Sequence, residues 1–382
     1  MTPYTAPFER RLLATRVIFV IIGLGMALWA PLVPVVQENL GLSKGDLGLL
    51  ILAMGGGVLL AMPLAGALAA KLGLRRAMII PAVIAFAAFP VLLSTSSVPV
   101  AAVALAVFGA GISIADVAMN MQAVIIEEEG KTPRMSSFHG MWSVGGILGA
   151  LTVSALLWLG TTPLMAALAV IAAAFLGLFL IRDGLIARSA DDDDKPLFVV
   201  PKGLVIWIGV LCALAMLPEF SVLDWSAVFL REQIGVSVAT AGLGYAVFSI
   251  GMVGFRIGGD RLRKAFGDPI VFLSSAVFGA GGLALVAASG SLWLALVGYL
   301  IMGAGIANLV PILFSIAGRS KDMPAHLALP AVVLVAQLGA LGGPAGIGLI
   351  AEQTSLRFAF LLLAGAVLVI GASYRVAKQD AG

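Results

Sequence analysis

The chain has 382 residues, of which 61% are hydrophobic and only 11% are charged, and its mean hydropathy is +1.10. The surface of a water-soluble globular protein needs far more charge, so this composition excludes that class. The net charge of +3 does not indicate nucleic-acid binding, because the basic residues lie in short loops between apolar runs.

Apolar runs of about 20 residues recur along the whole chain, and a helix of that length crosses a bilayer. Glycine, proline and charge clusters separate the runs and predict twelve spans in an all-α polytopic membrane protein. The first six spans are expected near residues 17–37, 47–70, 76–96, 99–127, 136–160 and 163–182. The second six are expected near 203–230, 238–259, 269–289, 292–317, 325–351 and 356–376.

The lysines and arginines between these spans predict the orientation of the chain, because inner loops carry an excess of them. With the N-terminus inside, 20 of the 23 basic residues fall on the inner side, Arg256 among them. Only Lys44, Arg231 and Arg357 fall on the outer side. Both termini are therefore expected in the cytoplasm, with the chain in the inner membrane as a multi-pass monomer.

The two halves of the sequence repeat each other. Residues 38–43 (ENLGLS) match 232–237 (EQIGVS), and residues 109–112 match 303–306, both reading GAGI. Both matches have the same offset, 232 − 38 = 194 and 303 − 109 = 194. A shared offset indicates a duplicated unit of six spans, and such repeats build transporters whose site lies between the halves.

A polar segment separates the repeats. Residues 183–202 contain Asp191–Asp194 followed by Lys195, and we expect a solvated cytoplasmic linker there. The predicted domains are thus an N-terminal six-helix bundle over 1–182 and a C-terminal six-helix bundle over 203–382.

Residues 109–129 form an apolar run that has polar side chains far from either end. An ionised carboxylate in lipid costs several kcal/mol or takes up a proton, so these side chains are expected to meet water or a polar partner. Helical spacing places the polar residues on one stripe: Ser113, Asp116, Asn120 and Glu127. We interpret this stripe as one wall of a solute pathway, with Asp116 as the leading proton site. The alternative for Asp116 is a structural hydrogen bond to a neighbouring helix.

Two further carboxylates, Glu219 and Asp224, lie inside the span predicted near 203–230. Glu219 is the rival proton site, because its depth in the span is similar to that of Asp116. Asp224 lies nearer the outer surface, where a structural pair or a gate is the stronger interpretation. Pro218 is expected to break the helix, which leaves the relative faces of the two acids open.

The remaining candidates are side chains that suit a small polar, sugar-like solute, because a sugar combines apolar faces with a rim of hydroxyl groups. The predicted substrate-binding residues are Trp29, Trp142, Phe220 and Trp225, with the amides Asn120, Gln122, Asn308 and Gln337. For each aromatic residue, packing or interfacial anchoring is the alternative. Glu127 and His139 are candidates for an inner gate and a pH sensor, against a solvated helix end and a loop histidine without a role.

Six plus six spans around a polar central loop resemble the major facilitator superfamily over the whole chain. That family has a loop signature, Gly-x-Leu-x-Asp-Arg-x-Gly-Arg-Lys, between spans 2 and 3. Here residues 66–76 carry Ala70 at the Asp position, whereas residues 256–262 keep Asp260 in the second copy. The resemblance implies alternating access around spans 1, 4, 7 and 10, with a proton as coupling ion and no other cofactor. It also implies a cytoplasmic gating latch that uses Arg256 and Asp260.

Residues 115–128, 136–150 and 224–232 look like the fucose-permease-like branch of that family, which includes proton-coupled sugar symporters. The branch places an acid in span 1, but residues 25–34 are uncharged here. Motifs of the drug antiporters are missing, since Leu105 stands at the position of their span-4 arginine. We therefore expect proton-coupled symport of a sugar-like solute, with export of amphipathic compounds as the alternative. A sensor or scaffold is a weaker alternative, and an enzyme or a metal site is not predicted.

Overall fold

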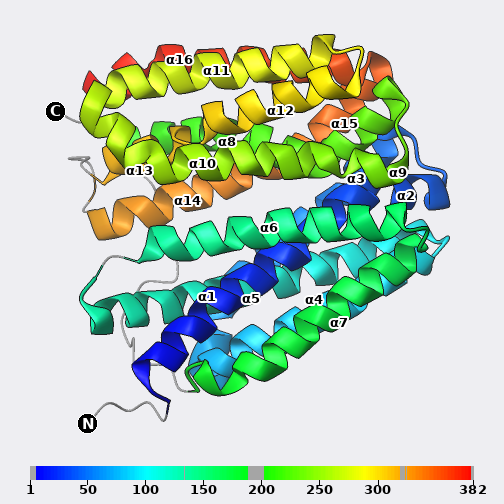
Figure 1. Ribbon diagram of the computed structural model, residues 1–382. Helices are drawn as coiled ribbons and strands as arrows, with labels where there is room; N and C mark the ends of the chain where they lie inside the picture. Colours follow the sequence, from blue (N-terminus) through cyan, green and yellow to red (C-terminus); the bar gives the residue numbers. More distant parts are fainter. Residues whose placement is uncertain (1–5, 133, 188–201, 319–322, 324, 380–382) are drawn as a thin grey trace. The chain divides into compact units, whose positions relative to one another are not determined.

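The structure is a computed structural model that describes residues 6–132, 134–187, 202–318, 323 and 325–379 (Figure 1). Helices make up almost all of the described chain, and no strand occurs in it. Twelve helical segments within those ranges are long and apolar enough to cross a membrane. The predicted fold class, an all-α protein with twelve spans, is therefore confirmed.

The first half of the chain supplies the first six spans. Its helices are α1 (Phe8–Ala27), α2 (Trp29–Leu40), α3 (Lys44–Leu72), α4 (Leu74–Ser94), α5 (Val98–Gly130), α6 (Met135–Trp158) and α7 (Pro163–Ile181), followed by the short η1 (Arg182–Gly184). The first span is divided into α1 and α2 at Leu28. Pro31 follows this point, and because proline has no N–H it cannot bond the carbonyl of Ala27 one turn earlier.

The second half supplies the other six spans. Its helices are α8 (Leu204–Phe229), η2 (Leu230–Ile234), α9 (Val238–Ala241), α10 (Leu243–Phe266), α11 (Asp268–Ala288), α12 (Leu292–Ile306), α13 (Leu309–Ala317), α14 (Ala325–Leu341), α15 (Gly343–Gln353) and α16 (Leu356–Gln379). Breaks at Ala307–Asn308 and at Gly342 precede Pro311 and Pro344 and so have the same cause as the break at Leu28.

The expected break at Pro218 is wrong, because α8 is continuous through it. A membrane helix tolerates a proline when neighbouring helices and hydroxyl side chains hold the freed backbone groups. On this continuous helix Glu219 and Asp224 are separated by about 140° of rotation, so they lie on different faces.

The chain forms two compact units that do not divide at a single point of the sequence. The first unit contains residues 1–41, 50–195 and 238–242, and the second contains 42–49, 196–237 and 243–382. Residues 42–49 are thus the part of the first half that packs within the second unit. Residues 238–242 are the reciprocal part of the second half, which packs within the first unit.

Inside the second unit, the first turn of α3 is held by polar contacts and close backbone packing. The Glu352 carboxylate of α15 accepts the N–H of Lys44 at 2.9 Å and of Gly45 at 3.3 Å, while the Lys44 ammonium lies 3.1 Å from Glu232. Gly348 of α15 lies so close to the carbonyl of Lys44 that a side chain there would collide with it. A carboxylate at a helix N-terminus satisfies the free N–H groups, so Glu352 is a helix cap.

The reciprocal segment, α9, is held inside the first unit in a different way. Thr240 accepts a hydrogen bond of 3.3 Å from the indole N–H of Trp158, and Gly242 leaves no room for a side chain beside Pro31 and Ser154. The two exchanged segments share their position in the repeat. Their described contacts differ, since a carboxylate caps the first turn of α3 and an indole N–H bonds a hydroxyl of α9.

Glycines set the closest helix contacts, and the same contacts recur in both units. In the first unit α3 and α5 cross where Gly57 meets the carbonyl of Ala106 and Gly109 meets that of Met54. In the second unit α10 and α12 cross in the same way, with Gly251 against Leu300 and Gly303 against Phe248. Each of these four pairs lacks space for a Cβ atom, which is the packing expected of small residues between membrane helices. The partners are related by the offset of 194 residues, so the sequence repeat is also a repeat of packing.

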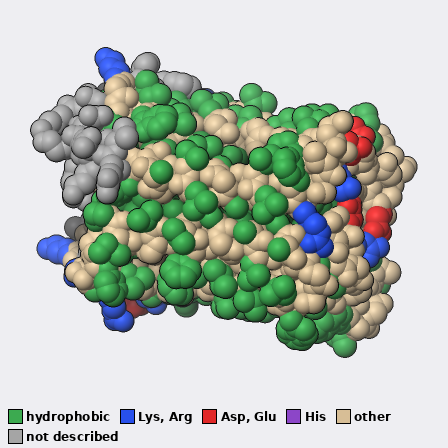
Figure 2. All heavy atoms as spheres, turned by 90° about the horizontal axis from the view of Figure 1, so that it is seen from above, with side chains coloured by type: hydrophobic (Ala, Val, Ile, Leu, Met, Phe, Trp, Pro, Cys, Tyr) green, Lys and Arg blue, Asp and Glu red, His purple; other side chains and the backbone are tan. Residues whose placement is uncertain are grey.

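Hydrophobic side chains cover most of the face shown in Figure 2, and its few charged side chains lie toward the ends. Leu60, Ile257 and Trp293 are examples of large apolar residues with more than 70% of their surface exposed. A surface of this kind is stable only when lipid covers it.

Within the predicted linker, residues 184–186 are buried, whereas Asp183, Ala187 and Lys202 are exposed. Leu185 and Ile186 are each only 2% exposed. Arg75 at the start of α4 donates from its backbone N–H to Ile186 at 2.7 Å and from its Nε to Leu185 at 3.1 Å. The acidic run Asp191–Asp194 lies outside the described residues.

Candidate solute pathway

The polar stripe of α5 is present in the first unit. Asp116 and Asn120 are half-buried, and the Asn120 amide donates to the Asp116 carbonyl at 2.9 Å and to its carboxylate at 3.4 Å. Ser113 is buried and donates to the carbonyl of Val58 on α3 at 3.3 Å. Within the described residues Asp116 has no ion-pair partner. Its one side-chain partner is a neutral amide, so its charge has no fixed compensation.

Gln122, predicted to bind substrate, makes hydrogen bonds within the protein through both ends of its amide. Its side chain is fully buried and its amide nitrogen donates to the Thr15 hydroxyl at 2.8 Å. Its amide oxygen accepts the backbone N–H of Ile186 at 2.9 Å. The Gln122 amide thus joins α5, α1 and the segment after η1. Its nitrogen and its oxygen are both hydrogen-bonded to protein groups.

Two acids at the C-terminal end of α5 hold neighbouring elements in place. The Glu127 carboxylate accepts the N–H groups of Arg134 and Met135 at 2.5 and 2.7 Å and so caps α6. Glu129 makes a two-point ion pair of 2.5 and 2.6 Å with Arg11 of α1, whose side chain is almost fully buried. The pair joins residues 118 positions apart and has no local signal.

In the second unit the carboxylate of Glu219 on α8 faces an arginine. The Arg256 guanidinium of α10 lies 3.6 Å from it, and its Nε lies 3.5 Å from the carbonyl of Ala307. Arg256 was predicted on the inner side as part of a loop signature. The span predicted near 238–259 already contains this residue. In the structure it lies within the span Val238–Gly259, ten residues before the end of α10 at Phe266. That distance is about 15 Å along the helix. The helix continues through the signature, which places the guanidinium deep within α10.

The predicted aromatic residues divide into two groups by burial. Trp29 and Trp225 are fully buried, and the Trp225 indole N–H has no hydrogen-bond partner in the described structure. Trp142 and Phe220 are half-buried. Burial favours packing as the role of the first two, and the last two keep the accessible surface that a solute contact needs.

The other predicted residues occupy four different settings. Asn308 is 4% exposed and donates to the carbonyl of Phe255 at 3.2 Å, which fixes the break between α12 and α13. Gln337 of α14 is half-buried, and Asp224 of α8 is 2% exposed. His139 is exposed, with its ring 5.4 Å from that of Phe19. The side chain of Asp260 lies outside the described part, so the latch expected there stays a prediction.

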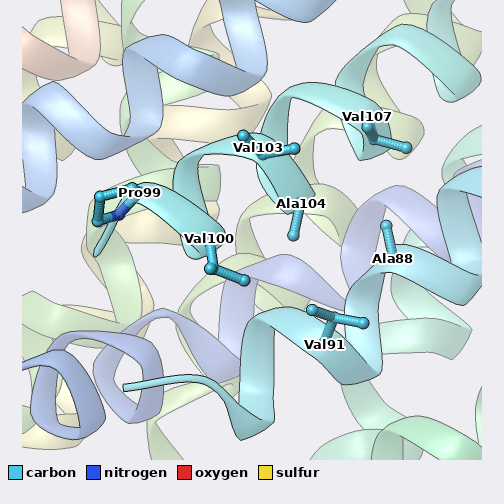
Figure 3. Close-up of a pocket in the computed structure, with 7 residues that line it drawn as sticks. All are labelled: Ala88, Val91, Pro99, Val100, Val103, Ala104 and Val107. Carbon is cyan, nitrogen blue, oxygen red and sulfur yellow. The ribbon is translucent and has the colours of Figure 1, made fainter. Parts of the chain in front are cut away.

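A groove between α4 and α5 does not belong to the pathway (Figure 3). It has a volume of about 370 Å³ and is lined only by apolar residues, namely Ala88, Val91, Pro99, Val100, Val103, Ala104 and Val107. Val103 is 65% exposed, as expected for a side chain that contacts lipid. The described residues also contain no group of three or more histidines, cysteines or acids that could hold a metal ion.

Comparison with known proteins gives a consistent result. The model of the Major Facilitator Superfamily (MFS) matches residues 17–328. An MFS-type transporter of Yersinia pestis is 44% identical over 366 residues, which are 96% of this chain and 95% of that protein. The membrane protein MosC of Rhizobium meliloti is 30% identical over 370 residues, which are 95% and 89% of the two chains.

Solved transporters share the fold at low sequence identity. The nucleoside transporter NupG has a TM-score of 0.77 at 13% identity, covering 96% of this chain and 98% of its own. The xylose transporter XylE from E. coli has a TM-score of 0.69 at 15% identity, covering 97% of each chain. With its twelve apolar spans and its duplicated units, the chain belongs to the major facilitator superfamily and is a multi-pass membrane transporter.

Proposed function

We propose that this protein is a proton-coupled symporter that moves a small polar, sugar-like solute across the inner membrane by alternating access. One observation carries the proposal: Asp116 lies within a membrane span, with a neutral amide as its side-chain partner and no ion-pair partner in the described structure. Burying an ionisable acid within a membrane span is energetically costly, so an acid retained there marks function more often than packing.

Asp116 couples the proton to the motion through its surroundings. A carboxylate holds a proton in dry surroundings and releases it to water, so its protonation follows which side of the membrane has access to it. Asn120, one turn further inward, already donates to Asp116 and is placed to respond to its charge. A solute that binds better to one state then biases the same equilibrium as the proton does.

Several parts of the proposal rest on sequence patterns. The excess of lysine and arginine in alternate loops supports an inner-membrane location with both termini in the cytoplasm. The motifs in residues 115–128 and 136–150 support the fucose-permease-like branch. Nucleosides and xylose are named for two proteins that share the fold, and at 13–15% identity they identify no substrate for this chain. The sugar-like solute therefore rests on Asn120, Trp142, Phe220 and Gln337, which keep accessible surface.

Uptake into proteoliposomes tests this function directly. Purified protein is reconstituted, and a panel of labelled sugars is offered with and without an inward proton gradient. Accumulation of one sugar only with the gradient is expected, together with alkalinisation of the outside. Export of an amphipathic dye driven by the same inward proton gradient, without sugar uptake, would instead establish the antiport alternative.

A further inference from the structure

The arginine inside α10 is the charged group of the second unit that the proposed function leaves unused. Arg256 shares a helical stripe with Tyr245 and Ser249, which are 5% and 6% exposed. The apolar Ile250 and Ile257, which are 48% and 72% exposed, lie about 100° or more around the helix. The guanidinium therefore starts from the interior face of α10 and not from the face that meets lipid.

The contacts of Arg256 are long in comparison with those of Arg11 and Arg263. Arg11 makes two bonds of 2.5 and 2.6 Å to Glu129, and Arg263 makes two of 2.7 and 3.2 Å to Asp268. Arg256 approaches Glu219 only to 3.6 Å, and its side chain keeps 34% of its surface exposed. A charge-assisted bond has a length of about 2.7–2.9 Å, so the Glu219 pair is loose.

The guanidinium also has donors to spare. It offers five N–H groups in a planar fork, and its contacts in the described structure are one long bond from Nε and the loose pair with Glu219. The geometry of this fork matches the two oxygens of a carboxylate. An anionic group that enters the second unit can therefore bind Arg256 more closely than Glu219 does.

We propose that Arg256 binds the carboxylate of the transported solute and that Glu219 is an internal competitor for the same guanidinium. In the empty protein Glu219 balances the charge of Arg256 from α8, and the incoming carboxylate displaces it. The substrate class is then a hydroxylated solute with one carboxylate, such as a sugar acid. This inference rests on the proposed transport function and assigns its substrate class.

The test compares three hydroxylated carboxylates with a neutral sugar on the full-length protein in detergent. Affinity is measured by thermal stabilisation with D-glucuronate, D-gluconate and L-lactate, and with D-glucose as the neutral counterpart. We expect the wild-type protein to be stabilised by a carboxylate and not by D-glucose. We expect Arg256→Gln to weaken that binding at least about tenfold, as loss of a charged hydrogen bond does. Glu219→Gln removes the competitor and should bind the same acid more tightly than wild type.

Two further variants keep the test decisive. Arg256→Gln combined with Glu219→Gln leaves no unpaired charge, so its failure to bind the acid is not a failure to fold. Arg263→Gln, seven residues along the same helix, removes a charge from a tight pair and should leave the affinity unchanged. Wild-type affinity in the double variant, or stabilisation by none of the three acids, overturns the proposal. Stabilisation that appears only in an anionic detergent or lipid also overturns the proposal. Arg256 would then bind the headgroup and not the carboxylate of the added acid.

The outcome is separable from the transport function itself. Gradient-driven uptake of neutral sugars that depends on Asp116 but not on Arg256 would refute the anion site and leave the transporter proposal standing. Binding of the acid without any transport in liposomes would support the anion site and refute the transporter proposal.

Discussion

The acids inside the two units differ in what faces them. Asp116 of the first unit faces the amide of Asn120, whereas Glu219 of the second unit faces the guanidinium of Arg256. An acid beside a neutral group can gain or lose a proton without leaving an opposite charge stranded. Glu219 instead lies 3.6 Å from a guanidinium whose side chain keeps 34% of its surface exposed. The proposed proton exchange thus belongs to the first unit and the proposed recognition of charge to the second.

The largest expected effect comes from Asp116→Asn, which fixes the neutral form of the acid. Accumulation of solute driven by a proton gradient should be abolished in liposomes, while counterflow exchange continues, because exchange needs binding but no net proton movement. Glu219→Gln is the control in the other unit. Wild-type accumulation by Asp116→Asn, together with its loss in Glu219→Gln, would reverse the roles of the units.

The next largest effect tests the charge balance of the second unit. Arg256→Gln leaves Glu219 without its cation in a membrane span, which is unfavourable, whereas the combined Arg256→Gln and Glu219→Gln variant leaves none unpaired. The single variant should unfold at a lower temperature than the double variant when both are heated in detergent. Equal unfolding temperatures would mean that the two charges do not depend on each other.

A smaller effect separates the two amides of α5. Gln122→Leu leaves the buried N–H of Ile186 without its acceptor and should lower the free energy of unfolding by about 1–3 kcal/mol. Solute affinity should stay unchanged, because Gln122 serves packing. Asn120→Leu is the matched change two residues earlier, and it should reduce transport more than stability. The pair of variants is measured by denaturation and by uptake.

The smallest expected effect comes from Glu352→Gln, which is the control for Glu219→Gln because both variants change a glutamate into glutamine. Glu352→Gln weakens the cap on the first turn of α3 and should cost about 1 kcal/mol or less. It shares the second unit with Glu219 but lies apart from the proposed anion site. Acid binding is therefore expected to match wild type in Glu352→Gln and to differ in Glu219→Gln. Tighter binding in both would make the Glu219 effect nonspecific.

The sequence predicts the membrane fold well, because apolar length and loop charge act locally along the chain. It also places Asp116 and Asn120 together, because residues four apart share a helix face. The same period puts Gln122 about 120° away from Asp116, so its structural role was within reach of the pattern. The span predicted near 238–259 contains Arg256, but the loop signature that begins there was interpreted as a latch, whereas α10 continues through it to Phe266. Its pairing with Glu219 joins residues 37 positions apart and depends on how α8 and α10 pack, which no local pattern encodes.

The exchange of residues 42–49 and 238–242 between the units has a consequence for the origin of the protein. The two segments overlap at the repeat offset of 194, so the swap is reciprocal. In an ancestor with one six-span unit, the same swap would have joined two identical copies as a symmetric domain-swapped dimer. A fusion of two such genes would turn this intermolecular exchange into an intramolecular one. Halves produced as separate polypeptides, cut in the segment between η1 and α8, should therefore be recovered together only when they are synthesised in the same cell.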